Sequence, residues 1–221
     1  MRRLSCFALP FVLPLTVLVI ASCGPRPVDV ARKDGDFNYD YGRYEEAAPS
    51  YLEIIDRYPG DWEAEYRYGM CLVYMGNAKE ARTHIETAAA ANPMNRAVAF
   101  ALADVYAKLN ERGRLVELLR SRAYSLGETE SWVKLAEIGA ELNDADLEDL
   151  AVANGLRMRG SGQWQAYVYD AKRSERKGER DLAIRRLRQA HFVNPNSPVV
   201  TLMLQERGIE TGPTTGLPPE Q

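Results

Sequence analysis

A recurring spacing of 34 residues is the feature of this sequence that most constrains its fold. Pro59 and Pro93 are separated by 34 residues, Trp62 and Trp164 by three times that distance, and Pro195 again follows Pro93 by three periods. A fixed period of this size is typical of stacked-repeat proteins, in which each unit buries its apolar face against its neighbours. The length of 221 residues suits a short array of such units.

The clearest unit predicts two amphipathic helices, Trp62–Tyr74 and Ala78–Ala91, joined by a turn that contains Gly76. Gly69 and Ala81 lie where the two helices are expected to touch, because residues without a large side chain let two backbones approach closely. The period thus predicts an all-α chain built from helical hairpins.

The same period divides the rest of the chain. Five units are expected within residues 28–197, at 28–61, 62–95, 96–129, 130–163 and 164–197. A capping helix is expected at residues 198–210, because a single helix with an apolar inner face can close the end of an array. Residues 211–221 contain three Pro and two Gly and are expected to be disordered.

The fourth unit fits the pattern least well. The apolar positions of its second helix are slipped by a residue or two, and Asn154-Gly155 and residues 160–162 predict breaks. Two interpretations follow, a defective repeat or a deliberate kink in the array.

The units resemble the tetratricopeptide repeat, a 34-residue helix-turn-helix motif. The positions that carry the resemblance in the second unit are Glu65, Tyr68-Gly69, Leu72, Ala81, Ile85 and Pro93. In the fifth unit they are Tyr167, Asp170-Ala171, Ser174, Ala183, Leu187 and Pro195. Glu65 departs from the family pattern, which has an aromatic residue there. The resemblance implies a right-handed all-α solenoid whose concave side, lined by the first helix of each unit, binds peptide segments.

Carried over to this chain, the resemblance implies a peptide groove. The expected groove residues are Tyr66, Met70, Tyr74, Phe100, Asp104, Lys108, Lys134, Ile138 and Lys172. Among them Tyr66, Tyr74 and Phe100 would form an aromatic patch for an apolar peptide side chain. In the alternative interpretation, these rings only pack against the next unit.

The first 23 residues resemble the signal of a bacterial lipoprotein. Arg2 and Arg3 precede an apolar run at residues 7–20, and the tetrad Ile20-Ala21-Ser22-Cys23 resembles a lipobox. The resemblance implies a signal peptide at residues 1–22 and a lipidated Cys23, followed by a tether over residues 23–33. An ordinary signal peptide with a chance cysteine is the alternative.

A lipidated Cys23 implies an anchor on the outer, periplasmic side of the cytoplasmic membrane, with palmitate among its acyl chains. Gly24 rather than Asp follows Cys23, which resembles outer-membrane sorting in bacteria with two membranes.

Composition argues against several functions. The 28 basic and 31 acidic residues give no overall field that would favour nucleic acid. His84 and His191 are far apart and are expected at the surface or at helix ends, and Cys71 is expected to be a buried, inert side chain. No catalytic motif or metal spacing is visible, so we expect neither enzyme activity, nor a metal, nor a cofactor.

The expected function is therefore a lipid-anchored scaffold of the cell envelope that binds other envelope proteins or peptide segments in its concave groove. The alternative is a regulatory or structural subunit of an envelope assembly, such as the machinery for outer-membrane protein insertion, pilus formation, secretion or peptidoglycan, contacting its partner by the convex face. Charge is uneven, since the first unit carries a net −5 and the fifth a net +4. That gradient would orient a partner, or it is simply a solvated surface.

Overall fold

The structure, a computed structural model, describes residues 26–219 of the chain. The expected signal peptide at residues 1–22 and the lipidation site Cys23 lie outside the described residues. Within the described part, all regular secondary structure is helical. The helices are α1 (Val28–Asp40), α2 (Tyr44–Arg57), α3 (Trp62–Tyr74), α4 (Ala78–Ala91), α5 (Arg96–Lys108), α6 (Arg112–Leu126), α7 (Thr129–Glu141), α8 (Ala145–Arg157), α9 (Gln163–Arg176), α10 (Arg180–Val193) and α11 (Pro198–Gln205).

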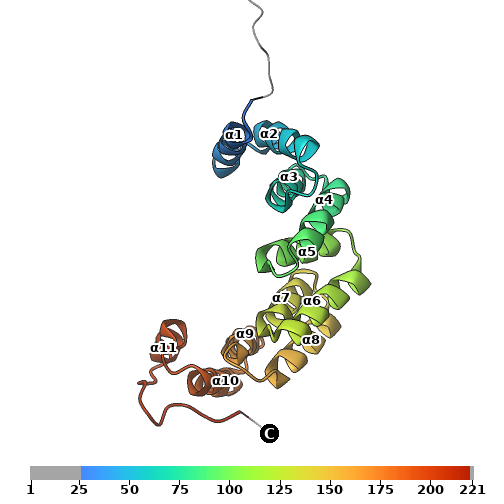
Figure 1. The fold of residues 1–221 in the computed structure, drawn as a ribbon. Coiled ribbons are helices and arrows are strands. Elements are labelled where there is room, and N and C mark those ends of the chain that lie inside the picture. Colours follow the sequence, from blue (N-terminus) through green and yellow to red (C-terminus); the bar gives the residue numbers. More distant parts are fainter. Residues whose placement is uncertain (1–25, 220–221) are drawn as a thin grey trace, which may run out of the picture.

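The helices form five consecutive hairpins and a final single helix, arranged as an open arc (Figure 1). The first helix of each hairpin lies on the inner side of the arc and the second helix on the outer side. Consecutive first helices from α3 to α9 also contact one another. The predicted fold class, an all-α solenoid of helix-turn-helix repeats, is confirmed.

Every hairpin turn contains one residue in the left-handed region. These residues are Gly42 (φ 72°), Gly76 (φ 84°), Asn110 (φ 57°), Asn143 (φ 54°) and Gly178 (φ 79°). Gly and Asn are the residues that adopt this conformation at least cost. Their spacing is 34, 34, 33 and 35 residues, so the fourth turn comes one residue early and the fifth restores the register.

A small buried residue occupies the same repeat position on each first helix. These residues are Gly35, Gly69, Ala103, Ala136 and Ala171, with the same spacing as the turns. At Gly69 an added Cβ would lie 2.5 Å from Ile85 Cγ1, which explains why this helix position has no side chain. The fourth hairpin is thus a regular unit that is displaced by one residue.

The break predicted at Asn154-Gly155 is absent, because both residues lie inside α8. Gly155 is buried, and an added Cβ would come within 3.3 Å of the Cβ atoms of Trp132 and Ala166. This glycine therefore serves close packing and does not end the helix. Residues 160–162 do lie in the connection between α8 and α9.

The expected tether overlaps the first helix, since α1 already begins at Val28. Arg26, just before it, is held by Asp34 and Glu53, each at 2.6 Å, and by the Ser50 hydroxyl at 3.0 Å. Chain attached to the first hairpin in this way cannot act as a free spacer, so residues 26–33 belong to the first hairpin and not to the expected tether.

The expected disorder of the C-terminal tail does not hold for residues 211–219. The Leu217 amide donates to Arg188 O at 3.0 Å, and Arg188 Nε donates to Thr215 O at 2.7 Å. Gly216 lies directly against the backbone of Phe192 on α10. The tail, which follows the short α11 in the sequence, therefore packs along α10.

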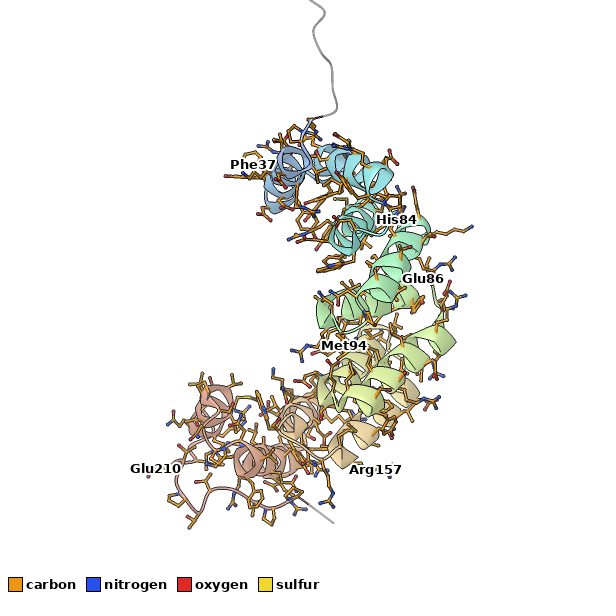
Figure 2. The ribbon with its side chains drawn as sticks, viewed as in Figure 1. Phe37, His84, Glu86, Met94, Arg157 and Glu210 are labelled. Atoms are coloured by element: carbon orange, nitrogen blue, oxygen red, sulfur yellow. The ribbon has the colours of Figure 1, made fainter. Side chains whose placement is uncertain are left out.

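Buried side chains fill the space between the two rows of helices (Figure 2). The core has three parts, one around Tyr51 at the first hairpin, one around Trp132 in the middle and one around Leu187 at the end. No helix within residues 26–219 combines the length and apolar character that crossing a membrane requires.

Candidate functional site

A groove of about 560 Å³ opens on the inner side of the arc, between α3, α5 and α7. Its position follows from the hairpin period, because the side chains of three successive first helices face the same side. The lining residues are Met70, Val73, Tyr74, Ala101, Asp104, Ala107, Lys108, Lys134, Ile138, Glu141 and Leu142.

The groove has an apolar floor. Ile138 is 1% exposed and belongs to the central core, while Met70 and Val73 are partly buried against that core. Tyr74 and Leu142 stand at opposite sides with 53% and 48% of their surface exposed. Apolar groups that remain open to solvent in a concave site are the usual anchors for a partner side chain.

The charges of the groove balance one another. Lys134 Nζ lies 2.7 Å from Asp104 Oδ1 and forms a salt bridge between α7 and α5. The remaining charged residues are one cation, Lys108, and one anion, Glu141, both exposed. The groove therefore offers polar contacts at its rim without a net charge that would select an acidic or a basic ligand.

The structure brings six of the nine predicted groove residues together. These are Met70, Tyr74, Asp104, Lys108, Lys134 and Ile138. Tyr66 and Phe100 are partly buried and pack against the central core, as in the alternative interpretation of these rings. Lys172 lies on α9 and does not line this groove.

Three tyrosines form an aromatic group at the N-terminal end of the groove, which we call the tyrosine cluster. The Tyr44 and Tyr74 rings are stacked with centroids 4.1 Å apart, and Tyr39 meets Tyr74 edge-on at 6.2 Å. The Arg67 guanidinium lies over the Tyr39 ring at 4.7 Å. Burial raises the pKa of Tyr39, so this phenol stays neutral. The cluster extends the groove towards α1 and α2.

Sequence reasoning found only Tyr74 of this cluster. Tyr39 and Tyr44 come from the first hairpin, whose first helix was too acidic to match the repeat well. The available signal was the periodic position of Tyr44, which follows the Gly42 turn by two residues.

The two histidines and the cysteine do not form a reactive site. His84 Nδ1 lies 2.7 Å from Oε2 of the buried Glu65. Glu65 occupies the position where the repeat pattern has an aromatic residue. His191 lies in the last turn of α10, at a helix end as expected, but it is buried and not at the surface. Burial raises the pKa of the Cys71 thiol to about 11, so this sulfur is not a thiolate nucleophile at neutral pH.

No three His, Cys, Asp or Glu side chains of residues 26–219 are grouped so as to hold a metal ion.

The hairpin period, the small contact residues and the inner groove define the class of this protein as a helical-repeat solenoid with a concave binding face. Residues 39–109, which extend from the end of α1 into the α5–α6 turn, match the family model of the tetratricopeptide repeat.

Solved structures share the fold. A MamA protein matches with a TM-score of 0.53 and 16% identity, over 84% of this chain and 98% of the other. MamA from Desulfovibrio magneticus RS-1 matches with a TM-score of 0.52 and 14% identity, over 77% and 97%. A tetratricopeptide repeat protein from Parabacteroides merdae has a TM-score of 0.53 and 12% identity, over 81% and 70%. No curated protein matches the chain. The tetratricopeptide repeat model thus matches residues 39–109, and the solved structures share the fold of most of the chain.

Proposed function

We propose that this chain is a lipid-anchored scaffold of the bacterial cell envelope that holds a segment of a partner protein in the groove between α3, α5 and α7. The observation that carries the proposal is the groove itself, with an apolar floor, two half-exposed apolar side chains and no net charge. Proteins with this repeat commonly act through such surfaces, without catalytic residues of their own.

The groove favours a segment with at least one bulky apolar side chain. Tyr74 and Leu142 offer apolar surface on either side of the floor formed by Ile138. Exposed Lys108 and Glu141 are available to hydrogen-bond the backbone of the segment or its polar side chains. The tyrosine cluster offers a second contact for the same segment, because Tyr74 belongs to both surfaces.

The proposed location rests on residues 1–23. The basic pair, the apolar run and the tetrad ending at Cys23 support an acyl anchor on the periplasmic side of the membrane. In a bacterium with two membranes, Gly24 supports sorting to the outer membrane.

Anchoring is tested by expressing the full chain with Cys23→Ala and following incorporation of labelled palmitate together with membrane fractionation. We expect the label and the membrane association to be lost in the variant. Undiminished incorporation in the variant would reject acylation at Cys23.

Groove binding is tested by crosslinking in the native cells, followed by mass spectrometry of the captured proteins. The variant is Tyr74→Asp with Leu142→Asp, because both side chains line the groove and are about half exposed. A matched control is Tyr41→Asp with Leu150→Asp, which changes two similarly exposed residues of the same types outside the groove.

We expect the groove variant to lose partners that the wild type and the control retain, since a carboxylate cannot be buried against an apolar ligand without a large cost. Equal capture by all three proteins would move the binding surface away from the groove.

A further inference from the structure

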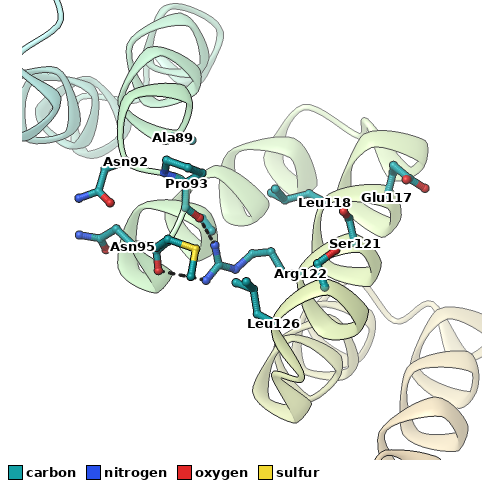
Figure 3. Close-up of a pocket in the computed structure, with 12 residues that line it drawn as sticks. Ala89, Asn92, Pro93, Asn95, Glu117, Leu118, Ser121, Arg122 and Leu126 are labelled. Carbon is teal, nitrogen blue, oxygen red and sulfur yellow. Dashed lines mark hydrogen bonds between the residues drawn. The ribbon is translucent and has the colours of Figure 1, made fainter.

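A second cavity, of about 450 Å³, lies between α4 and α6 (Figure 3). It is bounded by the end of α4, the α4–α5 turn, one residue of α5 and one face of α6. The residues that line it are Ala89, Asn92, Pro93, Met94, Asn95, Ala99, Glu117, Leu118, Ser121, Arg122, Ser125 and Leu126. None of them lines the groove described above.

Arg122 accounts for this cavity. It occupies the helix position held by Ala88 in α4 and by Ala190 in α10, each separated from it by a whole number of 34-residue periods. Ala88 and Ala190 are fully buried, and an arginine at such a position needs far more room. Correspondingly, α5 and α6 pack over a smaller interface than the helices of the other hairpins. The enlarged space between α4 and α6 is the cavity.

The charge of Arg122 is fully compensated inside the protein. Its guanidinium donates to Pro93 O at 2.5 Å and to Met94 O at 3.4 Å (Figure 3). It also forms a two-pronged pair with Glu128, at 3.0 and 3.2 Å. At the rim, Glu117 is paired with Arg120 at 2.5 Å. The cavity therefore presents no uncompensated charge to a ligand.

The mouth of the cavity is apolar and open. Met94 is 67% exposed, and Leu126 is also exposed beside it. Ser121 and Ser125 form one wall with short side chains, which leaves the space above Leu118 accessible. Cavities of a few hundred cubic ångströms with apolar walls and a few polar groups are typical of ligand sites.

We propose that this cavity is a second docking site, which receives one bulky, uncharged apolar side chain from a segment of a partner protein. Charge complementarity supports this occupant: all the charges around the cavity are already paired, so a charged side chain would be desolvated there without compensation. Leu118, Leu126 and Met94 supply the apolar contacts. The site is independent of the groove, so the scaffold has two binding faces.

The test uses nuclear magnetic resonance of the methionine methyl groups in the full chain, reconstituted in lipid nanodiscs. Met94 reports on the cavity and Met70 on the groove, and each signal is assigned by a single Met→Leu substitution. The probes are capped pentapeptides of sequence Gly-Ser-Xaa-Ser-Gly in which the central residue is Phe, Leu or Asp. Empty nanodiscs establish how much of each peptide partitions into lipid.

We expect the Phe and Leu peptides to shift the Met94 signal saturably, and the Asp peptide to bind at least about tenfold more weakly. Ser121→Phe should abolish the shift by filling the cavity from an exposed position. The matched control Ser161→Phe also changes an exposed serine, but lies outside the cavity and should leave the shift intact.

The proposal is overturned if no peptide moves Met94, or if the shift persists in Ser121→Phe. A shift confined to Met70 would likewise reject the second site and would support the groove alone. If the groove does not bind the peptides, the Met70 signal stays unchanged. The two proposals are therefore tested separately.

Discussion

The second and third hairpins have the same length and topology, yet they pack differently. In α3–α4 the contact positions hold Gly69 on the first helix and Ala81, Ile85 and Ala88 on the second. In α5–α6 the positions one period later hold Ala103, Leu115, Leu119 and Arg122. All these contact residues are buried, and the third hairpin has the larger side chain at three of the four positions, since only Ile85 and Leu119 are equal in size.

The distance between two packed helices depends on the side chains between them. The second hairpin therefore closes tightly, while the third is held apart and leaves a cavity beside α6. One repeat motif thus produces both a closely packed unit and a unit that borders a cavity, and the two differ in side-chain volume at three contact positions.

The largest expected effect on this contrast comes from Arg122→Ala, which gives α6 the residue found in α4. The substitution removes the partner of Glu128 and leaves the carbonyls of Pro93 and Met94 without their donor. Breaking a buried ion pair by removing one member is costly, so we expect a loss of about 3 kcal/mol in the free energy of unfolding. Urea denaturation followed by circular dichroism measures it.

Arg120→Ala is the control for that substitution, since Arg120 is exposed and its pair with Glu117 should contribute at most about 0.5 kcal/mol. If both variants were equally stable, the buried contacts of Arg122 would not contribute to the stability of the protein.

The next effect compares two glycines, Gly69 in α3 and Gly113 in α6. An added Cβ at Gly69 would lie 2.5 Å from Ile85 Cγ1 and 3.3 Å from Ala81 O, whereas nothing lies within 4 Å at Gly113. We expect Gly69→Ala to destabilise the protein by about 2 kcal/mol through overpacking. Gly113→Ala should stabilise it by up to about 0.5 kcal/mol through helix propensity. Thermal unfolding of the two variants checks the opposite signs, and a harmless Gly69→Ala would mean that the second hairpin is not closely packed.

Much of the fold could be predicted from the sequence, because the helical period depends on residues that act locally. Gly76 ends one helix and Gly69 permits contact with the next, so the bounds Trp62–Tyr74 and Ala78–Ala91 follow from short-range chemistry and agree with the structure. The sequence indicated a slip of a residue or two in the fourth unit, but not its exact size, because Asn143 replaces the glycine that marks most of the other turns.

The site was harder to predict. Successive residues on a helix point about 100° apart, so an error of one residue in the face assignment is enough to place partly buried side chains such as Tyr66 and Phe100, which pack against the core, in the groove. The tyrosine cluster combines Tyr39, Tyr44 and Tyr74 from three helices, a proximity that no local pattern contains. The tail is held by backbone hydrogen bonds to Arg188, which composition does not reveal.

A third, smaller effect concerns motion. Because α5 and α6 share a smaller interface, we expect the third hairpin to open more easily than the second. The opening free energy should be lower by about 1 kcal/mol, so the Leu119 amide should exchange hydrogen about fivefold faster than the equivalent Ile85 amide, after correction for intrinsic rates. Hydrogen exchange with residue-level resolution measures both. Equal protection would show that the looser packing has no energetic consequence.

The smallest expected effect concerns the contact that joins the two hairpins. The hydroxyl of Tyr106 on α5 donates to Glu86 Oε1 on α4 at 2.9 Å, and Arg114 Nη1 approaches the same oxygen at 3.1 Å. Burial, followed by the hydrogen bond to Glu86, raises the pKa of Tyr106 to about 12 from its ordinary value of 10. A raised pKa means that the stabilisation is fully present below pH 10 and is lost as the pH rises from 10 to about 12.

Tyr106→Phe removes both the hydrogen bond and this titration. At pH 8 we expect the variant to be less stable than the wild type by about 0.5 kcal/mol. Between pH 10 and 12 the difference should shrink and then reverse sign, because keeping the phenol protonated in the folded state while the unfolded chain ionises costs the wild type more than the hydrogen bond contributes. Urea unfolding at a series of pH values measures the difference, and subtracting the variant removes the common contribution of the other tyrosines. A difference that stayed constant up to pH 12 would show that the second and third hairpins are not joined through a neutral Tyr106.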